Sequence, residues 1–194
     1  MFQVRIHGRG GQGVVSAAEM LSMAAFDEGR HAQAFPSFGS ERMGAPVTSF
    51  CRIDDREIRT REPVMAPNVV VIQDPTLLHQ VDLFAGLVPD GYILVNSTRG
   101  FETLGIGDFV RAFPAERRCV VAATEIAMKH LGRPLPNAAL LGGFAALTRA
   151  LSIESVCRAI RGKFAGKVGE ANALAAREAF DVVASALAPQ AAHA

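Results

Sequence analysis

One glycine-rich run near the N-terminus constrains this chain more than any other stretch. It reads Gly8-Arg9-Gly10-Gly11-Gln12-Gly13, which satisfies the pattern G-x-G-x-x-G with one extra glycine. A strand-like segment, residues 2–6, precedes it, and a helix-like segment, residues 14–28, follows it. A turn of bare backbone before a helix presents unpaired N–H groups and a partial positive charge. The run therefore predicts a phosphate or pyrophosphate cradle, and the alternative is a turn that only packs tightly.

Composition narrows the class of protein. The chain has 194 residues, enough for one domain with a sizeable core, and a net charge of +1. A charge this small gives no reason to expect binding to nucleic acid or to a membrane surface. Every apolar run is interrupted before it reaches transmembrane length, and the N-terminus lacks the pattern of a signal peptide. We therefore expect a cytoplasmic protein.

Strand and helix patterns alternate along the first two thirds of the chain. Strands are predicted at residues 2–6, 31–35, 47–53, 57–59, 69–72, 92–95 and 119–122. Helices are predicted at residues 14–28, from Asp74-Pro75 onward, and at 124–131, 137–151, 152–161 and 168–187. This order indicates an α/β fold with a Rossmann-like, mostly parallel sheet flanked by helices. Residues 47–59 are predicted to form an inserted β-hairpin, and the C-terminal part is predicted to be helical.

The domain organisation follows from the same pattern. Residues 1–187 are predicted to form a single domain, and residues 188–194 a disordered tail. Gly142-Gly143 lies inside an apolar helical segment, where two adjacent glycines suggest close packing against another backbone.

The segment after the first helix argues against a dinucleotide site. The NAD fingerprint requires an acidic residue about 20 residues beyond the glycines, to bind the ribose hydroxyls. Residues 31–35 contain no acid and lead instead into a loop, residues 36–46, rich in glycine and proline. Loops of this kind beside a cradle are often functional, and the alternative is an ordinary connection. The candidate binding residues are Gly8, Arg9, Gly10, Gly11, Gln12 and Gly13 of the cradle, and Ser40, Glu41 and Arg42 of the loop.

No catalytic constellation is visible in the sequence. It lacks a G-x-S-x-G elbow, a P-loop and an H-E-x-x-H motif. The three cysteines form no C-x-x-C pair, so neither an iron–sulfur cluster nor a zinc site is expected on this chain. Arg9 and Arg42 suit phosphate through charge and fork geometry, but no nucleophile or base accompanies them. The chain is therefore interpreted as a binding domain that works within a larger assembly, without catalytic or metal-ligating residues of its own.

Several motifs resemble one family. Residues 6–19 read IHGRGGQGVVSAAE, and the glutamine-containing glycine motif is more specific than a plain G-x-G-x-x-G. This opening resembles the gamma subunit of 2-oxoacid:acceptor oxidoreductases, which begins with G-x-G-G-Q-G and a V-x-x-A-A helix. Residues 38–47, FGSERMGAPV, resemble the Y-G-x-E-x-R-G-G loop of that family, with Phe38 for tyrosine, Arg42 one position early and Ala45 for the second glycine. Later stretches at residues 123–127, 136–143 and 172–176 are also similar.

The resemblance implies a role as one subunit of a larger enzyme. Such enzymes oxidatively decarboxylate a 2-oxoacid with thiamine diphosphate, pass electrons through iron–sulfur clusters and form an acyl-CoA. The resemblance implies thiamine-binding alpha and beta subunits and an iron–sulfur subunit as partners, and it leaves open a flavin or NAD electron-transfer subunit. Thiamine diphosphate and [4Fe-4S] clusters would lie on those partners, while this chain would contribute coenzyme A contacts and subunit packing. Alone it would be inactive.

Two other functions remain open from the sequence. A free-standing Rossmann-type dehydrogenase would use the same cradle for a nucleotide, although the missing acidic residue argues against it. A purely structural subunit would use the glycine turn only for packing. The sequence selects neither the 2-oxoacid, for which pyruvate, branched-chain and aryl substrates such as phenylglyoxylate all suit the family, nor the electron acceptor, which is either ferredoxin or NAD.

Overall fold

The computed structural model describes residues 1–37 and 43–188. Its strands are β1 Phe2–Arg9, β2 His31–Pro36, β3 Pro46–Asp54, β4 Val69–Ile72, β5 Tyr92–Asn96 and β6 Arg118–Val121. Its α-helices are α1 Val14–Asp27, α2 Gly107–Val110, α3 Ala123–Leu131, α4 Asn137–Thr148, α5 Ile153–Lys163 and α6 Gly166–Leu187. Two short 3₁₀ helices, η1 Pro75–His79 and η2 Ala115–Arg117, complete the described elements.

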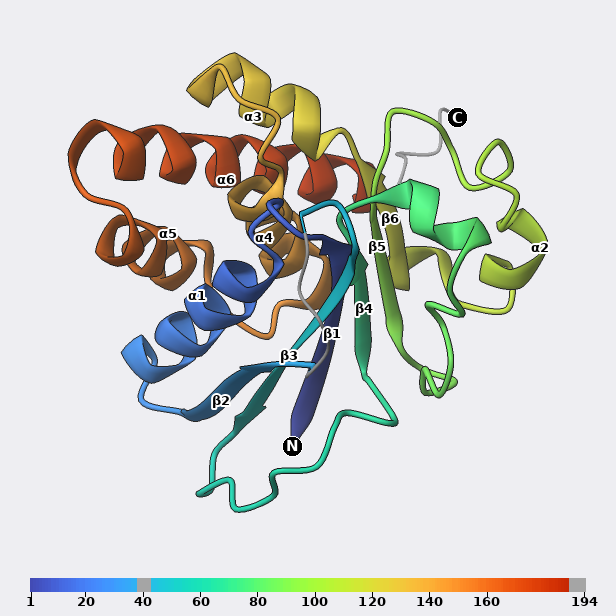
Figure 1. Ribbon diagram of the computed structural model, residues 1–194, viewed down its shortest axis with the longest axis horizontal. Coiled ribbons are helices and arrows are strands. Elements are labelled where there is room, and N and C mark those ends of the chain that lie inside the picture. The colour runs from blue at the N-terminus through green and yellow to red at the C-terminus, as the bar shows by residue number, and fades with distance from the viewer. Residues whose placement is uncertain (38–42, 189–194) are drawn as a thin grey trace, which may run out of the picture.

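The strands form one mixed sheet in the order β2-β3-β1-β4-β5-β6. The neighbours β1 and β4, β4 and β5, and β5 and β6 are parallel, whereas β3 is antiparallel to both β1 and β2. Helices α1, α4, α5 and α6 cover one face of the sheet (Figure 1). The segment that contains η1 and α2 lies on the other side. The predicted α/β class with a mostly parallel sheet is therefore confirmed.

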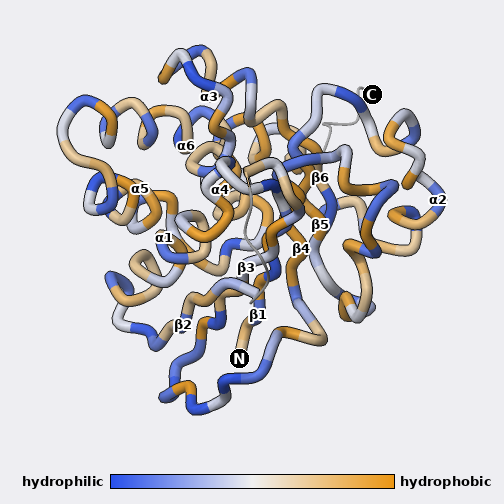
Figure 2. The backbone as a smooth tube through the Cα atoms, in the orientation of Figure 1, coloured by the Kyte–Doolittle hydropathy of each residue, from blue (hydrophilic) through white to orange (hydrophobic). Residues whose placement is uncertain are grey.

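Two apolar cores lie on the two faces of the sheet. The larger packs α1, α4, α5 and α6 against β1, β3 and β4. The smaller packs side chains of β4 and β5, among them Val70 and Ile93, against Leu77, Leu83 and Val110 from the opposite layer. The central strands β4 and β5 carry apolar side chains toward both layers, so they read as continuous apolar runs. Figure 2 shows that these central strands are hydrophobic, whereas the loop that follows β3 is largely hydrophilic.

The prediction of a β-hairpin at residues 47–59 is correct for its first strand and wrong for its second. The segment at residues 47–53 is a strand, β3, but its antiparallel partners are β1 and β2, and residues 57–59 form no strand. Both edges of β3 are already hydrogen-bonded, so no edge remains for a returning strand. Arg59 instead pairs with Glu57 in an exposed loop. The strand that follows α1 takes this place: β2 and β3 form an antiparallel pair, and the sequence predicts both strands but not their pairing.

Helix α4 is the central helix of the larger core. Residues 137–147 are all buried, and a Cβ on Gly142 would lie 1.8 Å from the carbonyl oxygen of Ala176 in α6. The predicted close approach of two backbones at Gly142 is therefore confirmed, and the partner is a helix of the same chain. A Cβ on Gly143 would meet only side chains, the nearest at 3.4 Å.

Three other expectations can be compared with the structure. Asp74 caps η1 through its side chain, as predicted, but the helix it begins spans only Pro75–His79. Within residues 1–37 and 43–188, no helix is long and apolar enough to cross a membrane. The predicted tail lies almost wholly outside the described residues, which end at 188.

Candidate functional site

The glycine loop connects β1 to α1 through a turn that excludes side chains at three positions. A Cβ on Gly8 would lie 2.6 Å from Cγ2 of Val14, so this glycine lets the helix pack on the strand. Gly11 and Gly13 have φ of 93° and 73°, the left-handed region that favours glycine. A Cβ on Gly13 would lie 2.5 Å from Nδ2 of Asn137, the first residue of α4. The predicted strand–turn–helix context is therefore present.

Residues 43–45, which precede β3, hold the glycine loop through backbone hydrogen bonds to Gly10. The amide of Gly10 donates to the carbonyl of Ala45 over 2.9 Å, and the amide of Gly44 donates to the carbonyl of Gly10 over 3.0 Å. The exposed side chain of Met43 lies over Gly11, where a Cβ would be 2.7 Å from its sulfur. The end of the loop at residues 36–46 thus lies beside the cradle, as its composition led us to expect. Ser40, Glu41 and Arg42 lie outside the described residues.

Gln12 and Asp74 lock the loop to the adjacent strand end. Oε1 of Gln12 accepts from the amide of Arg9 over 2.8 Å, and its Nε2 donates to Oδ2 of Asp74 over 2.9 Å. Asp74 follows β4 and also accepts from the amide and hydroxyl of Thr76. The glutamine of the glycine motif is therefore a brace between two strand ends, which explains why a glutamine at this position fits the fold.

The guanidinium of Arg9 is directed at its own chain. Its Nε donates to Asp74 over 3.1 Å, and its Nη1 to the carbonyl of Gly44 over 3.0 Å. Its Nη2 donates to Thr76 and Gln80. Four of its five N–H donors are thus engaged within the chain, which leaves little capacity for a phosphate. Sequence reasoning treated Arg9 as a phosphate ligand, and that role stays a prediction.

Asp74 is the acceptor on which this bracing depends. Burial alone would raise its pKa, but hydrogen bonds from Thr76 and Gln12, together with the charge of Arg9, lower the pKa below the usual value for aspartate. The ionised carboxylate is therefore stabilised by folding. Its contribution is present above the unfolded-state pKa and is lost as pH falls through the lower folded-state pKa.

We expect Asp74→Asn to lower the free energy of unfolding by about 2 kcal/mol at neutral pH. An amide cannot accept at both oxygen positions, so donors from Arg9, Gln12 or Thr76 lose their acceptor. Urea denaturation measures the effect, and Asp82→Asn serves as control. Among residues 1–37 and 43–188, Asp82 accepts a single long hydrogen bond, from the amide of Phe84 at 3.3 Å. Equal stability of the two variants would show that Asp74 does not hold the loop.

The amino end of α1 is open toward the ligand side. Its N-cap is Gly13, which has no side chain to accept from the helix, and no acidic residue lies in the first turn. In the described part of the chain, the amides of Gly13, Val14, Val15 and Ser16 have no recorded acceptor. These groups carry the partial positive charge that the cradle hypothesis requires.

Three hollows adjoin the glycine loop. One of about 450 Å³ lies against Val14 and Ser16, and one of about 540 Å³ lies between α1, α4 and α6. The third, of about 500 Å³, lies at the carboxyl ends of β4 and β5. In open α/β sheets, ligands bind outside the carboxyl ends of the strands. All three hollows include Gly11, so the glycine loop is the shared centre of the candidate site.

Polar residues that sequence reasoning did not include line the third hollow. Asn96, the last residue of β5, donates from Nδ2 to the carbonyl of Gln73 and to Oγ1 of Thr124, each over 2.8 Å. Its Oδ1 accepts from the amide of Thr124. The side chain of Gln73 is buried, and neither of its polar atoms has a partner among the described residues. The available signal was their position at the carboxyl ends of strands: Gln73 follows β4, Asn96 ends β5, and Thr124 lies in the first turn of α3, which follows β6.

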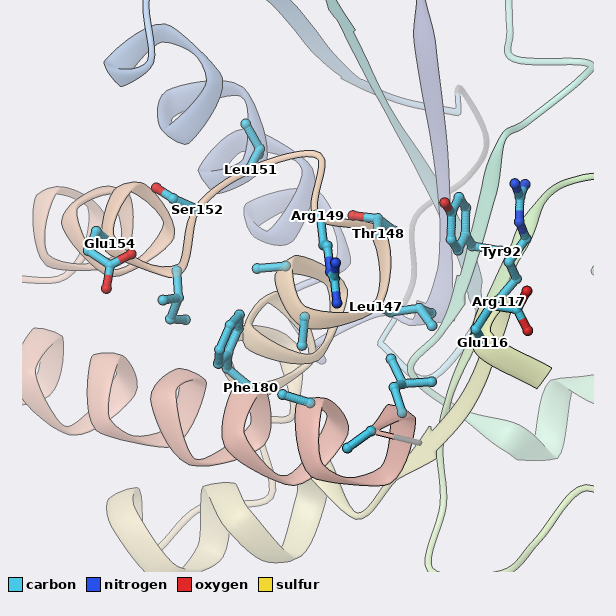
Figure 3. Close-up of a pocket in the computed structure, with 16 residues that line it drawn as sticks. Tyr92, Glu116, Arg117, Leu147, Thr148, Arg149, Leu151, Ser152, Glu154 and Phe180 are labelled. Atoms are coloured by element: carbon cyan, nitrogen blue, oxygen red, sulfur yellow. The ribbon is translucent and has the colours of Figure 1, made fainter. Parts of the chain in front are cut away.

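A larger hollow of about 940 Å³ lies elsewhere on the molecule (Figure 3). It is lined by Tyr92 at the amino end of β5, by Arg117, and by the carboxyl-terminal parts of α4 and α6. This is the end of the sheet opposite the glycine loop. Its size therefore does not make it the candidate site, because the strand ends that converge on ligands in this fold lie at the other edge.

The described residues do not offer the clustered thiolates that an iron–sulfur cluster requires. Cys51, Cys119 and Cys157 are buried free thiols on β3, β6 and α5. Burial raises the pKa of Cys51 to about 12 and that of Cys119 to about 11. No group of three or more metal-binding side chains comes together within residues 1–37 and 43–188. The described residues therefore do not fit an iron–sulfur cluster, and no electron-transfer step is derived through them.

Comparisons with known proteins identify the family. Residues 3–182 match the model of the pyruvate ferredoxin/flavodoxin oxidoreductase family. A common gamma subunit of pyruvate/ketoisovalerate oxidoreductases from Pyrococcus abyssi is 49% identical over 181 residues, 93% of this chain and 96% of that protein. Subunit PorC of a pyruvate synthase from Methanothermobacter thermautotrophicus is 45% identical over 94% of this chain and 96% of its own. The crystal structure of a pyruvate oxidoreductase subunit PORC from Thermotoga maritima superimposes with a TM-score of 0.78 at 37% identity, covering 93% of this chain and 95% of that one.

The chain belongs to the pyruvate ferredoxin/flavodoxin oxidoreductase family, and within it to the gamma subunits. The resemblance carried by the glycine motif is confirmed. It follows that the chain is a subunit of a multisubunit oxidoreductase that acts on 2-oxoacids.

Proposed function

We propose that this gamma subunit contributes coenzyme A contacts, through the glycine loop and the amino end of α1, to a complex that converts a 2-oxoacid to an acyl-CoA. Thiamine-binding alpha and beta subunits would carry out decarboxylation, and an iron–sulfur subunit would carry the electrons away. This chain would hold the anionic part of coenzyme A and position it for acyl transfer. The observation that carries the proposal is the open amino end of α1 at Gly13, which faces hollows on three sides.

The physical support is electrostatic. Coenzyme A carries a pyrophosphate, and unpaired amides at the start of a 14-residue helix stabilise such an anion. Gly11 and Gly13 let the backbone approach the anion without side chains in between. The chain's own role is therefore binding and orientation, with no proton or electron transfer assigned to it.

The topology disfavours the alternative of a free-standing dehydrogenase. In a dinucleotide-binding fold, the strand after the first helix lies next to β1 and supplies the acid for the ribose. Here β3 is inserted between β1 and β2, and β2 contains no acidic residue. The end of β2 is therefore one strand farther from the glycine loop than the corresponding strand end in a dinucleotide-binding fold. A purely structural role is the remaining alternative, and the bracing by Arg9 and Gln12 is the observation in its favour.

Subunit packing is the second part of the proposal. Within the described residues, several large apolar side chains are exposed, a pattern expected where partner subunits cover the surface. They include Phe26, Met43, Met65, Phe109, Val168 and Leu174. Gly142 and Gly143 do not belong to this surface, because both are buried against α6 and β5 in the same chain.

We expect Gly13→Ala in the assembled complex to raise the KM for coenzyme A about tenfold, equivalent to about 1.4 kcal/mol. The alanine would strain a residue at φ 73°, and its Cβ would displace the amide of Asn137 from the amino end of α1. Decarboxylation of the 2-oxoacid and the first electron transfer should proceed at the normal rate. Steady-state and half-reaction kinetics measure both effects.

Gly29→Ala is the matched control for backbone strain. Gly29 lies just beyond the other end of α1 at φ 74°, and a Cβ there would meet nothing within 4 Å. This variant should leave the KM for coenzyme A unchanged. Native mass spectrometry first confirms that both variants assemble. If assembled Gly13→Ala keeps a normal KM for coenzyme A, or slows decarboxylation instead, the proposed role of the cradle is wrong.

A further inference from the structure

Three helices begin at one hollow. The hollow of about 540 Å³ is lined by Gly13 at the start of α1, by Asn137 at the start of α4, and by Lys167 and Val168 in the first turn of α6. None of these helices has a side-chain cap or an acidic residue in its first turn, within the described residues. By contrast, α5 is capped by Ser152 and has Glu154 in its first turn. The uncapped amino ends place three partial positive charges around one cavity.

A buried amide at the same hollow lacks a partner. Asn137 is 5% exposed, and no hydrogen bond of its side chain is recorded among residues 1–37 and 43–188. Its Nδ2 lies against Gly13, where a Cβ on that glycine would come within 2.5 Å. The amide is not sealed in the core but keeps contact with solvent at the hollow, so a ligand there can reach it. An anion in the hollow would accept from this amide and from the adjacent helix ends together.

The charges around the hollow have the same sign. Arg133 and Lys167 line it, and neither has a carboxylate partner in the part of the chain that the structure describes. Nearby basic side chains are paired: Lys163 with Glu19, Arg161 with Glu170, and both Lys129 and His130 with Glu178. No aspartate or glutamate is among the described lining residues. Part of its wall is apolar and includes Leu135 and Phe164.

We propose that this hollow is the phosphate subsite of the chain, with Arg133, Lys167 and Asn137 as ligands of a phosphate or pyrophosphate group. The apolar wall would accept an uncharged arm of the same ligand. The proposal rests on the proposed function only for the identity of the ligand. Gly11 and Gly13 belong to both the hollow and the cradle. In place of Arg9, most of whose donors are engaged within the chain, it assigns the phosphate to two cations that no carboxylate in residues 1–37 and 43–188 pairs with.

The first test uses inorganic pyrophosphate as the probe and the full chain as the protein. Isothermal titration calorimetry at low salt should show binding that weakens as ionic strength rises. Lys167→Gln and Arg133→Gln should each weaken it about three- to tenfold. Lys163→Gln is the matched control, because Lys163 lies four residues from Lys167, pairs with Glu19 and does not line the hollow. Absence of binding, or equal loss in Lys163→Gln and Lys167→Gln, would overturn the subsite.

The second test uses the assembled complex and separates the subsite from the function. If the ligand is coenzyme A, Lys167→Gln and Arg133→Gln should raise the KM for coenzyme A by the same factor, with kcat for decarboxylation unchanged. Pyrophosphate binding that depends on Lys167, with an unchanged KM for coenzyme A, supports the subsite and contradicts its assignment to coenzyme A. A KM that responds to Gly13→Ala but not to Lys167→Gln or Arg133→Gln supports the cradle and overturns the subsite.

Discussion

Gly142→Ala is expected to lower the free energy of unfolding by at least about 3 kcal/mol, because one methyl group would occupy the space of a backbone carbonyl. The added Cβ would lie 1.8 Å from the oxygen, 2.5 Å from the carbon and 2.9 Å from the Cα of Ala176. All three atoms belong to the backbone and none to a flexible side chain, so α4 and α6 would have to move apart. A loss of this size corresponds to a decrease in Tm of roughly 6–12 °C for a domain of this length.

Gly143→Ala is the control that the chain itself provides. The two glycines are adjacent in the same buried helix, but a Cβ on Gly143 would meet Val183 and Leu94 at ordinary contact distances of 3.4–3.6 Å. Alanine also has a higher helix propensity than glycine, by about 1 kcal/mol. We therefore expect Gly143→Ala to be as stable as the parent or slightly more so. Thermal and urea denaturation of the two variants decide the matter, and similar stabilities would contradict the backbone contact between α4 and α6.

The second large effect is an acid destabilisation caused by His7. This residue of β1 is 5% exposed, and its Nδ1 lies 3.2 Å from Oγ1 of Thr48. Burial, and then the charge of Arg5, lower the pKa of His7 from 6.5 to about 3. The carbonyl of Leu83, which already accepts from Arg5, offsets only part of this. Between pH 6.5 and about 3, the imidazole of His7 is therefore mostly neutral in the folded protein but mostly protonated in the unfolded chain.

The free energy of unfolding decreases as the pH falls because His7 resists protonation in the folded protein. Between pH 6.5 and about 3, the unfolded chain binds one more proton at His7 than the folded protein, so stability falls as pH falls. The loss attributable to His7 should be about 3 kcal/mol between pH 6.5 and roughly pH 4. His7→Gln should make the slope of unfolding free energy against pH shallower by about one proton, whereas replacing the exposed His31 by glutamine should not. Urea denaturation at a series of pH values measures the slopes, and an unaltered slope in His7→Gln would show that His7 is protonated in the folded state.

The local sequence was sufficient for the elements and for the cradle. The central strands β4 and β5 are marked by apolar runs, because strands covered on both faces favour apolar side chains. Gly8 to Gly13 indicated the strand–turn–helix unit, since backbone conformations with positive φ leave a direct trace in the sequence. Gly142-Gly143 indicated a close approach of backbones for the same reason. These features are local, and so is the information that encodes them.

Strand pairing was not available from local patterns. The segment at residues 47–53 was identified as a strand, but its insertion between β1 and β2 depends on hydrogen bonds to residues more than ten positions away along the chain. The turn-like pair Asp54-Asp55 after β3 led us to expect residues 57–59 as a returning strand, but they form none. A strand pattern states which residues alternate between two faces, but it does not state which neighbour occupies each edge.

By itself, the sequence determined the fold class, the family and the position of the glycine loop, because each of these depends on residue types at fixed spacing. Only the tertiary structure decided how the loop is used. It directs Arg9 at Asp74, Gly44, Thr76 and Gln80, and it places the first residues of α1, α4 and α6 around one hollow, although they are far apart in the sequence. Side-chain direction and the convergence of distant helix ends arise from packing, and packing is a property of the folded chain.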